Sequence, residues 1–276
     1  MHNPIPYRVV IIGSGYSIRD NLWNTNIDKL PIWKKIKNEF TIGTNFTYNW
    51  FTPTVLMYAD YQFYFSQKES LKNIPLILGK TDGAYLRKGA IGVDNNVVLL
   101  KECERKQKLI WKEREIGTHA HYWGKDAWTK GWYSSQLIGL KALNMAIALD
   151  CKEIYLLGFD AGGDDENRTH FYSDTEKGKY VWNNTKHCGV GKDKKGYYKT
   201  GNYNKLEELN KYWFEPFENE LKNGVKIYNV SLNSNITTFP KINYKEFYHK
   251  LNETQTLNQQ DIRKYIKFRL RETNAM

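Results

Sequence analysis

Short runs of apolar residues recur along the chain, each followed by glycine or by a polar turn. The first, Tyr7 to Ile12, is apolar on both faces and stops at a glycine-rich turn, and a second spans Glu153 to Leu157. A strand that is apolar on both faces is typical of a parallel sheet covered by helices on both sides. Further strands are expected at residues 40–45, 54–65, 76–78, 97–100 and 226–230.

Two segments with a helical period of apolar residues precede strands in the second half of the chain. Leu137 to Leu149 comes before the strand at 153–157, and Lys205 to Leu221 comes before the strand at 226–230. Helices that alternate with buried strands indicate the α/β class. We therefore expect a Rossmann-like, mainly parallel sheet with flanking helices.

Two segments do not fit this alternation. Ala161 to Asn204 is rich in Gly, Asp, Asn, Lys and aromatic residues and has no sustained period, which is typical of a lid that orders over a ligand. Residues 241–276 indicate a helical, basic C-terminal tail. We expect one nucleotide-binding domain at residues 1–240, with a lid at about 161–204, followed by the tail at 241–276.

Composition narrows the classes of protein that the chain can belong to. It has 276 residues, of which 41% are hydrophobic and 26% are charged, which is close to ordinary globular values and argues against intrinsic disorder. Mean hydropathy is −0.68, and no run approaches the roughly 18 apolar residues of a membrane span. The first ten residues show no secretion leader, and three widely spaced cysteines favour a reducing compartment (Cys103, Cys151 and Cys188). A cytoplasmic protein is expected.

The chain is basic, with 41 Lys and Arg against 30 Asp and Glu and a formal net charge of +11. Such a balance favours anionic partners such as nucleotides, nucleic acid, acidic glycans or a phospholipid surface. An AT-rich genome produces the same bias toward Lys, Asn, Ile and Tyr. Charge alone therefore predicts no nucleic-acid complex.

Candidate ligand contacts lie where the predicted strands end, because open α/β sheets bind ligands beyond the carboxyl ends of their strands. The turn from Gly13 to Ser17 combines two glycines, which permit close approach of a ligand, with the hydroxyls of Ser14 and Ser17. Ile18 stands where a GxGxxG motif would have its third glycine, and the GK[ST] of a P-loop is missing. A plain strand–helix turn is the alternative.

Two further strand ends carry polar side chains. Gly158-Phe159-Asp160 ends the strand at 153–157, and Asp160 could hold a ribose, a metal or an acceptor hydroxyl, or cap the next turn. Asn45 ends the strand at 40–45, and its amide can donate and accept hydrogen bonds at once, as base or sugar recognition demands. An ordinary turn asparagine is the alternative there.

Histidines suggest acid–base chemistry more than a metal site. His119 and His121 form a close pair without an evident third ligand. His170 and His187 lie in the predicted lid, where an imidazole that titrates near neutral pH could serve as a general acid or base. A GxSxG nucleophile elbow is missing, which disfavours a serine hydrolase.

Three blocks of the sequence together resemble one family of enzymes. Residues 11–17 resemble the opening "strand-G-N-G-P-S" of the family-42 bacterial sialyltransferases and of the related MptE-like 6-hydroxymethylpterin diphosphokinase group. Residues 146–160 match the family's "AIALG-x-KEIYL-x-G-[IF]-D" block almost residue for residue, and residues 227–234 are similar to its late strand ending in "P-N-S". The departures, Ser14 for asparagine, Tyr16 for proline and Ile138 for serine, bear on CMP-sialic acid more than on nucleotide binding.

The resemblance implies a sheet that binds a nucleotide-activated donor under a lid. Carried over by position, it implies donor contacts in the phosphate–ribose region, near the nucleotide and on the cytidine side: Gly13, Ser14, Gly15, Ser17, Asn45, Gly158, Asp160, Asn233 and Ser234. A lid histidine is the family's general base, which makes His187 the first candidate and His170 the second. Lid tyrosines contact the phosphate, and the candidates are Tyr172, Tyr180, Tyr197 and Tyr198.

The sequence thus favours a glycosyltransferase-like enzyme that transfers a sugar from a nucleotide donor to the hydroxyl of an acceptor, which the basic charge suggests is anionic. No cofactor is expected beyond optional assistance by Mg²⁺. Three alternatives stay open. They are a Mg²⁺-dependent diphosphokinase that uses Asp160, Asp164 and Asp165, a nucleic-acid-modifying transferase with a basic tail, and a non-catalytic nucleotide-binding or virion-associated protein.

Overall fold

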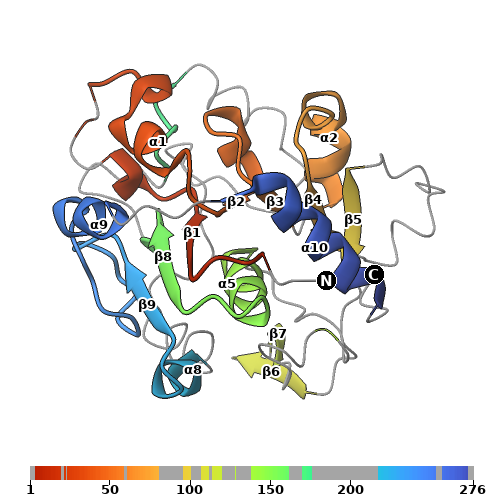
Figure 1. Ribbon diagram of the computed structural model, residues 1–276. Coiled ribbons are helices and arrows are strands. Elements are labelled where there is room, and N and C mark those ends of the chain that lie inside the picture. The colour runs from red at the N-terminus through yellow and green to blue at the C-terminus, as the bar shows by residue number, and fades with distance from the viewer. Residues whose placement is uncertain are drawn as a thin grey trace.

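A seven-stranded parallel sheet forms the centre of the computed structural model (Figure 1). Its strands are β1 (Arg8–Ile12), β2 (Thr41–Thr44), β3 (Val55–Tyr58), β4 (Ile77–Lys80), β5 (Val97–Leu100), β8 (Glu153–Leu157) and β9 (Lys226–Asn229). The structure describes residues 4–19, 22, 24–58, 61–80, 96–100, 107–111, 114–119, 128, 138–161, 170–175, 217–252 and 257–272.

The order of the strands places β1 at a change of direction. The sheet runs β5-β4-β3-β2-β1-β8-β9, so the chain proceeds outward from β1 to β5 and then crosses to the other side of β1. In register, Ile11 pairs with Ile42 of β2 and with Leu156 of β8. Open α/β sheets bind ligands at such a switch point, where loops leave neighbouring strands in opposite directions. The carboxyl ends of β1 and β8 are therefore the place to look for a site.

Helices cover both faces of the sheet, which explains why all five residues of β1 are buried. On one face, α5 (Ile138–Ala148) and α10 (Gln259–Glu272) share a core with Val9 and Ile11. On the other face, α1 (Pro31–Ile36) and α9 (Tyr244–Leu251) pack against Val10 and Ile12. Beside them, α2 (Tyr61–Leu71) covers β3 and β4. The α/β class and the Rossmann-like parallel sheet predicted from the sequence are confirmed.

Shorter elements connect these layers. Among the described residues, three 3-10 helices follow strand ends or loops, namely η1 (Tyr16–Arg19), η2 (Ile27–Lys29) and η3 (Asn45–Asn49). The short α8 (Glu218–Lys222) leads into β9. A separate antiparallel hairpin is formed by β6 (Gln107–Trp111) and β7 (Arg114–His119), which the apolar pattern does not predict.

The strand predicted at residues 54–65 is wrong in its second half. β3 ends at Tyr58, and the chain continues as helix α2 from Tyr61. The aromatic residues of this segment favour strands in isolation. Phe63 and Tyr64 instead belong to a helix, and their rings are buried against that of Tyr58 in β3. Packing of the side chains thus overrides intrinsic strand preference. The helix expected at 205–221 is described only from residue 217 onward.

The predicted C-terminal tail is helical and is packed into the fold. Phe247 of α9 and Ile266 of α10 are fully buried, on opposite faces of the sheet. The boundary at residue 240 between a domain and a tail stays a prediction. Among the residues that the structure describes, none of the helices is long and apolar enough to span a bilayer.

A buried ion pair ties the start of β1 to the segments around it. Arg8 donates from Nε to Oε2 of Glu39 at 2.9 Å, from Nη2 to Oε1 at 3.0 Å, and from Nη1 to the carbonyl of Lys250 at 2.7 Å. Both side chains are less than 10% exposed. The pair thus connects β1, the entry to β2 and the end of α9.

We predict that Glu39→Ala lowers the free energy of unfolding by about 3 to 5 kcal/mol, because it leaves the Arg8 cation buried without its counter-ion. Urea denaturation followed by circular dichroism measures the change. Glu69→Ala is the control, because it removes an exposed ion pair with Lys72 and should cost less than about 1 kcal/mol. Equal effects of the two substitutions would contradict the prediction.

Candidate functional site

The loops that follow β1 and β8 lie directly against each other. The amide of Gly13 donates to the carbonyl of Leu157 at 2.7 Å, and that of Gly15 donates to the carbonyl of Gly158 at 2.9 Å. A methyl group on Gly15 would come within 2.3 Å of Oδ2 of Asp160, so only glycine fits. We call residues 13–15 the glycine turn and residues 158–161 the Asp160 loop. The structure therefore brings together the two strand-end motifs that the sequence singled out.

Asp160 links the two loops and keeps one oxygen available. Its Oδ2 accepts a hydrogen bond from the backbone amide of Ser17 at 2.8 Å. Burial raises the pKa of Asp160, and the proximity of Ser17 and Ser231 partly opposes that rise. Within the described residues, neither Oδ1 of Asp160 nor Oγ of Ser17 makes a hydrogen bond of ordinary geometry. Buried polar atoms in this condition are typical of a place where a ligand or water completes the bonding.

Asn45 lies at the end of the neighbouring strand β2. Its φ of +47° is in the left-handed region, which asparagine tolerates better than most residues. The hydroxyl of Thr44 donates to the carbonyl of Ile12 at 3.0 Å, which fastens the end of β2 beside the glycine turn. Oδ1 of Asn45 is buried and has no hydrogen-bond partner among the described residues. Asn45 thus contributes a third unpaired polar group to the same edge of the sheet.

Ser234 supports the Asp160 loop from beneath. Its hydroxyl donates to the carbonyl of Phe159 at 2.7 Å and accepts from Nδ2 of Asn229 at 2.8 Å. The amide of Asn235 donates to the carbonyl of Asp160 at 2.8 Å. Ser234 is therefore placed as a brace of the site, whereas Asn233 beside it is exposed. A role for either residue in nucleotide binding stays a prediction.

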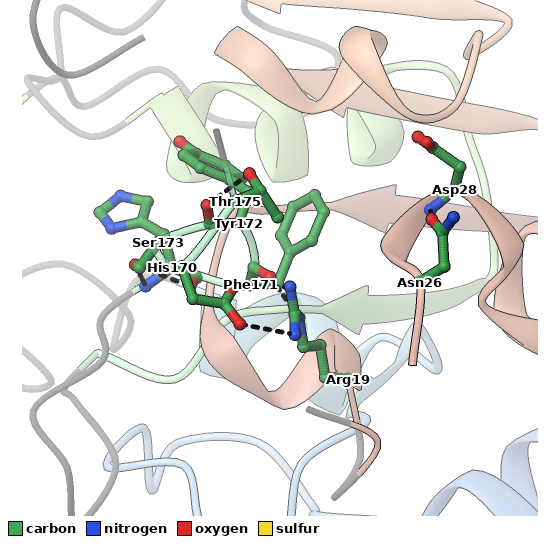
Figure 2. Close-up of polar contacts among 9 residues, drawn as sticks. Arg19, Asn26, Asp28, His170, Phe171, Tyr172, Ser173 and Thr175 are labelled. Carbon is green, nitrogen blue, oxygen red and sulfur yellow. Dashed lines mark hydrogen bonds and ion pairs between the residues drawn. The ribbon is translucent and has the colours of Figure 1, made fainter. Parts of the chain in front are cut away.

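Part of the predicted lid, residues 170–175, packs onto the glycine turn, and Figure 2 shows the side chains of this segment. The amide of Phe171 donates to the carbonyl of Ser14 at 3.0 Å. The ring of Tyr172 stacks on Trp50, with centroids 4.7 Å apart and an interplanar angle of 11°. Burial raises the pKa of Tyr172, and a hydrogen bond with the Ser14 side chain partly offsets the rise. We call this segment the 170–175 turn.

His170 lies at one end of this turn, with its ring centroid 5.3 Å from that of Tyr172. Although the residue keeps partial contact with solvent, burial of the imidazole lowers its pKa from 6.5 to about 4. At neutral pH the imidazole is therefore neutral and able to accept a proton. An anion bound nearby would raise the pKa toward the range of an effective general base.

Several predicted site residues lie outside the described residues. These are His187, Tyr180, Tyr197 and Tyr198, together with His121, Asp164 and Asp165. In the part of the chain that the structure describes, no cluster of three or more His, Cys, Asp or Glu could hold a metal ion. The expectation of no required cofactor stays a prediction.

Three residues that matter for the geometry of the site escape prediction from the sequence. Trp50 provides the ring beneath Tyr172, Asn229 holds Ser234, and Arg19 reaches the 170–175 turn from η1. Each acts on a partner more than four residues away, so no local motif marks it. Arg19 stands between Ile18 and Asp20 in a segment of mixed polarity, so no signal in the sequence could have found it.

The fold is similar to those of several solved bacterial sialyltransferases. CstII from Campylobacter jejuni with CMP-3FNeuAc is 16% identical, with 86% of each chain covered and a TM-score of 0.45. The same enzyme with cytidine-5'-monophosphate gives 17% identity, coverage of 86% and 84% of this chain and that one, and a TM-score of 0.43. Monofunctional α-2,3-sialyltransferase Cst-I from C. jejuni is 16% identical, with 98% and 96% covered and a TM-score of 0.43. No family model and no curated protein matches the chain.

We predict that His170 makes the protein less stable in acid. Its native pKa of about 4 lies below the 6.5 of an unperturbed histidine, so between these values the unfolded chain binds a proton that the native protein excludes. The free energy of unfolding should fall by up to roughly 3 kcal/mol as pH drops from about 7 to 4, and this contribution should be constant above pH 7.

Urea denaturation of the wild type and of His170→Gln at several pH values measures this contribution as the difference between the two curves. His249→Gln, which changes an exposed histidine of α9, is the matched control. Parallel curves for wild type and His170→Gln would contradict the burial of the imidazole.

Proposed function

We propose that the protein is a nucleotide-sugar-dependent glycosyltransferase of the sialyltransferase-like kind. The observation that carries the proposal is the convergence of the three family-like sequence blocks. Residues 11–17, 146–160 and 227–234 are far apart in the chain, yet they meet through the hydrogen bonds of Gly15, Asp160 and Ser234. They do so at the β1/β8 switch point, where α/β sheets bind nucleotides.

The unpaired polar atoms of the site fit a donor with several hydroxyl groups. Oδ1 of Asp160 and Oδ1 of Asn45 can accept hydrogen bonds, and the hydroxyl of Ser17 can donate and accept. A ribose or an amino group of a base offers the matching donors. The glycine turn then lies where the phosphate would approach the backbone, with Gly13, Ser14 and Gly15 along it.

In the proposed reaction, a hydroxyl of the acceptor attacks the anomeric carbon of the sugar. The bond from that carbon to the phosphate oxygen breaks, and its electron pair leaves with the nucleotide. A lid histidine takes the proton of the attacking hydroxyl, with His187 as first candidate and His170 as second. Transition-state charge grows on the departing phosphate, where tyrosine hydroxyls stabilise it. Tyr172 beside Ser14 is the described candidate, and Tyr180, Tyr197 and Tyr198 are the others.

The neutral state of His170 is consistent with this second-choice role. A base must be unprotonated before the reaction, and the lowered pKa of His170 keeps it so at neutral pH. The dianionic character of a nucleotide donor would favour the imidazolium that forms during transfer. The same argument extends to any acceptor with a negative charge, which the net charge of +11 favours.

Two further parts of the proposal concern conditions rather than the reaction itself. Transfer proceeds without a required metal, since departing phosphate is stabilised by side chains. The protein works in the cytoplasm, which is supported by the odd number and wide spacing of its three cysteines.

A thermal-shift panel of CMP, UMP, UDP, GDP and ATP, each with and without Mg²⁺, tests the proposal. A ligand that binds only the folded state stabilises it by about 2.7 kcal/mol at a hundred times its dissociation constant. We expect a response to CMP that does not depend on Mg²⁺. A response confined to ATP with Mg²⁺ would replace the proposal with a diphosphokinase, and silence across the panel would contradict nucleotide binding.

A pair of glycine substitutions locates the response. Gly15→Ala should abolish the CMP shift, because the new methyl group would collide with Asp160 at the base of the site. Gly79→Ala in β4 is the matched control, because its new methyl group would collide with the ring and hydroxyl of Tyr58 but lies three strands away from β1. A CMP shift that survives Gly15→Ala would place the nucleotide elsewhere.

Histidine substitutions test the assignment of the base. His187→Ala should lower turnover by about two to four orders of magnitude, with CMP affinity nearly intact, because a general base acts on the transition state. The assay follows CMP released from CMP-sialic acid in the presence of an oligosaccharide acceptor, with His249→Ala as control. The same loss in His170→Ala alone would move the base to His170, and full activity in both variants would contradict a lid histidine as base.

A further inference from the structure

A buried arginine reaches the 170–175 turn from the segment that follows the glycine turn. The Arg19 side chain is 2% exposed. It donates from Nη2 to Oδ1 of Asp174 at 2.7 Å and from Nη1 to Oδ2 at 3.2 Å, and Nε donates to the carbonyl of Phe171. This two-pronged contact with a carboxylate, with a third bond to a carbonyl, uses the planar fork that lysine lacks.

The 170–175 turn is held together by hydrogen bonds between its own residues. The hydroxyl of Ser173 donates to the carbonyl of His170 at 2.8 Å and accepts from the His170 amide at 3.2 Å. The amide and hydroxyl of Thr175 both donate to the carbonyl of Tyr172, at 3.1 and 2.9 Å. A bond that fixes Asp174 or the Phe171 carbonyl therefore also fixes the positions of His170 and Tyr172.

The same turn is held a second time at the glycine turn. The carbonyl of Ser14 accepts a hydrogen bond from the amide of Phe171 at 3.0 Å, and the Ser14 side chain is hydrogen-bonded to Tyr172. Ser14 and Arg19 are five residues apart, so one short segment of chain holds the 170–175 turn at two places. Figure 2 shows Arg19 approaching the turn from one side, whereas the rings of His170 and Tyr172 lie away from it.

We propose that Arg19 is a positioning residue, which holds His170 and Tyr172 against the glycine turn through Asp174 and the carbonyl of Phe171. Its consequence for sugar transfer rests on the proposed function, because only then are His170 and Tyr172 near the reacting atoms. The hold on the turn itself does not depend on that function. The two can therefore be tested apart.

Asp174 is the better partner to change. Its side chain is 46% exposed, so that Asp174→Asn alters the contact without opening the core, whereas removal of Arg19 would disturb a buried site. Asparagine keeps the shape of the side chain and one acceptor oxygen, but it loses the negative charge and the second acceptor oxygen. Glu69→Gln is the matched control, because it makes the same change in the Glu69–Lys72 ion pair, whose Oε2–Nζ distance is 2.6 Å.

Hydrogen exchange of the ligand-free protein tests the hold directly. In Asp174→Asn, exchange of the amides in residues 170–175, above all that of Phe171, should accelerate by about threefold to tenfold. Arg19→Lys, which keeps the charge but not the fork, should give a smaller acceleration, and Glu69→Gln should give none. Unchanged exchange in Asp174→Asn, or an equal acceleration in Glu69→Gln, would overturn the proposal.

A split between kcat and CMP affinity tests the catalytic consequence. Asp174→Asn should lower kcat for CMP release from CMP-sialic acid by about tenfold and leave the Kd of CMP within about twofold, since positioning acts on the reacting groups. Arg19→Gln should also lower kcat, and Arg19→Lys, which keeps the positive charge, should lower kcat less. An unchanged kcat in Asp174→Asn would overturn the positioning role. A wild-type protein that neither binds CMP nor releases it would instead contradict the proposed function, and hydrogen exchange would still decide the hold.

Discussion

The close approach of the β1 and β8 loops is the contact on which the rest of the site depends. Parallel pairing of the two strands brings their carboxyl ends side by side, but the loops can close on each other only because Gly15 has no side chain. Gly158 makes the matching turn at a φ of +68°, which a residue with a side chain rarely adopts. Without this fit, Asp160 would not reach the amide of Ser17, and η1 would lose its connection to β8.

That contact also orders the segments that come later in the chain. Because Asp160 and Ser17 are bonded, η1 starts at a fixed angle and carries Arg19 inward. The glycine turn presents the Ser14 carbonyl to the amide of Phe171 from the same short segment. The position of the 170–175 turn is thus a consequence of strand pairing, transmitted over fewer than ten residues. Rigid elements of this kind are what a site needs in order to hold reacting groups in place.

The sequence predicts the sheet well because its strands are buried on both faces. Runs such as 7–12 and 153–157 have no polar side to confuse with a helix, and the structure places strands there within one residue. The segment from Tyr61 onward is the instructive failure, since its aromatic residues suit a strand or a buried helix equally and only packing decides. The β6–β7 hairpin is missed because nothing in its apolar pattern marks a turn.

The sequence predicts the strand-end turns of the site, but it does not predict the side chains that hold these turns in place. Glycines and a strand-end aspartate leave a local signature, because the turn that they form is made of neighbouring residues. Arg19, Trp50 and Asn229 leave none, since each acts on a residue brought near by the fold. Their importance follows from their contacts and from the burial of their side chains, which only the folded structure shows.

Hydrogen bonding separates ligand contacts from supports within the predicted set. Ser234 has its hydroxyl engaged on both sides, as donor to Phe159 and as acceptor from Asn229, so a ligand would have to break existing bonds to use it. Asp160 and Asn45 each keep a buried oxygen without a partner among the described residues. Leaving such an atom unsatisfied costs about 1 to 3 kcal/mol, which a bound hydroxyl or amine would recover. On this physical ground, Asp160 and Asn45 are the stronger ligand contacts and Ser234 is the stronger support.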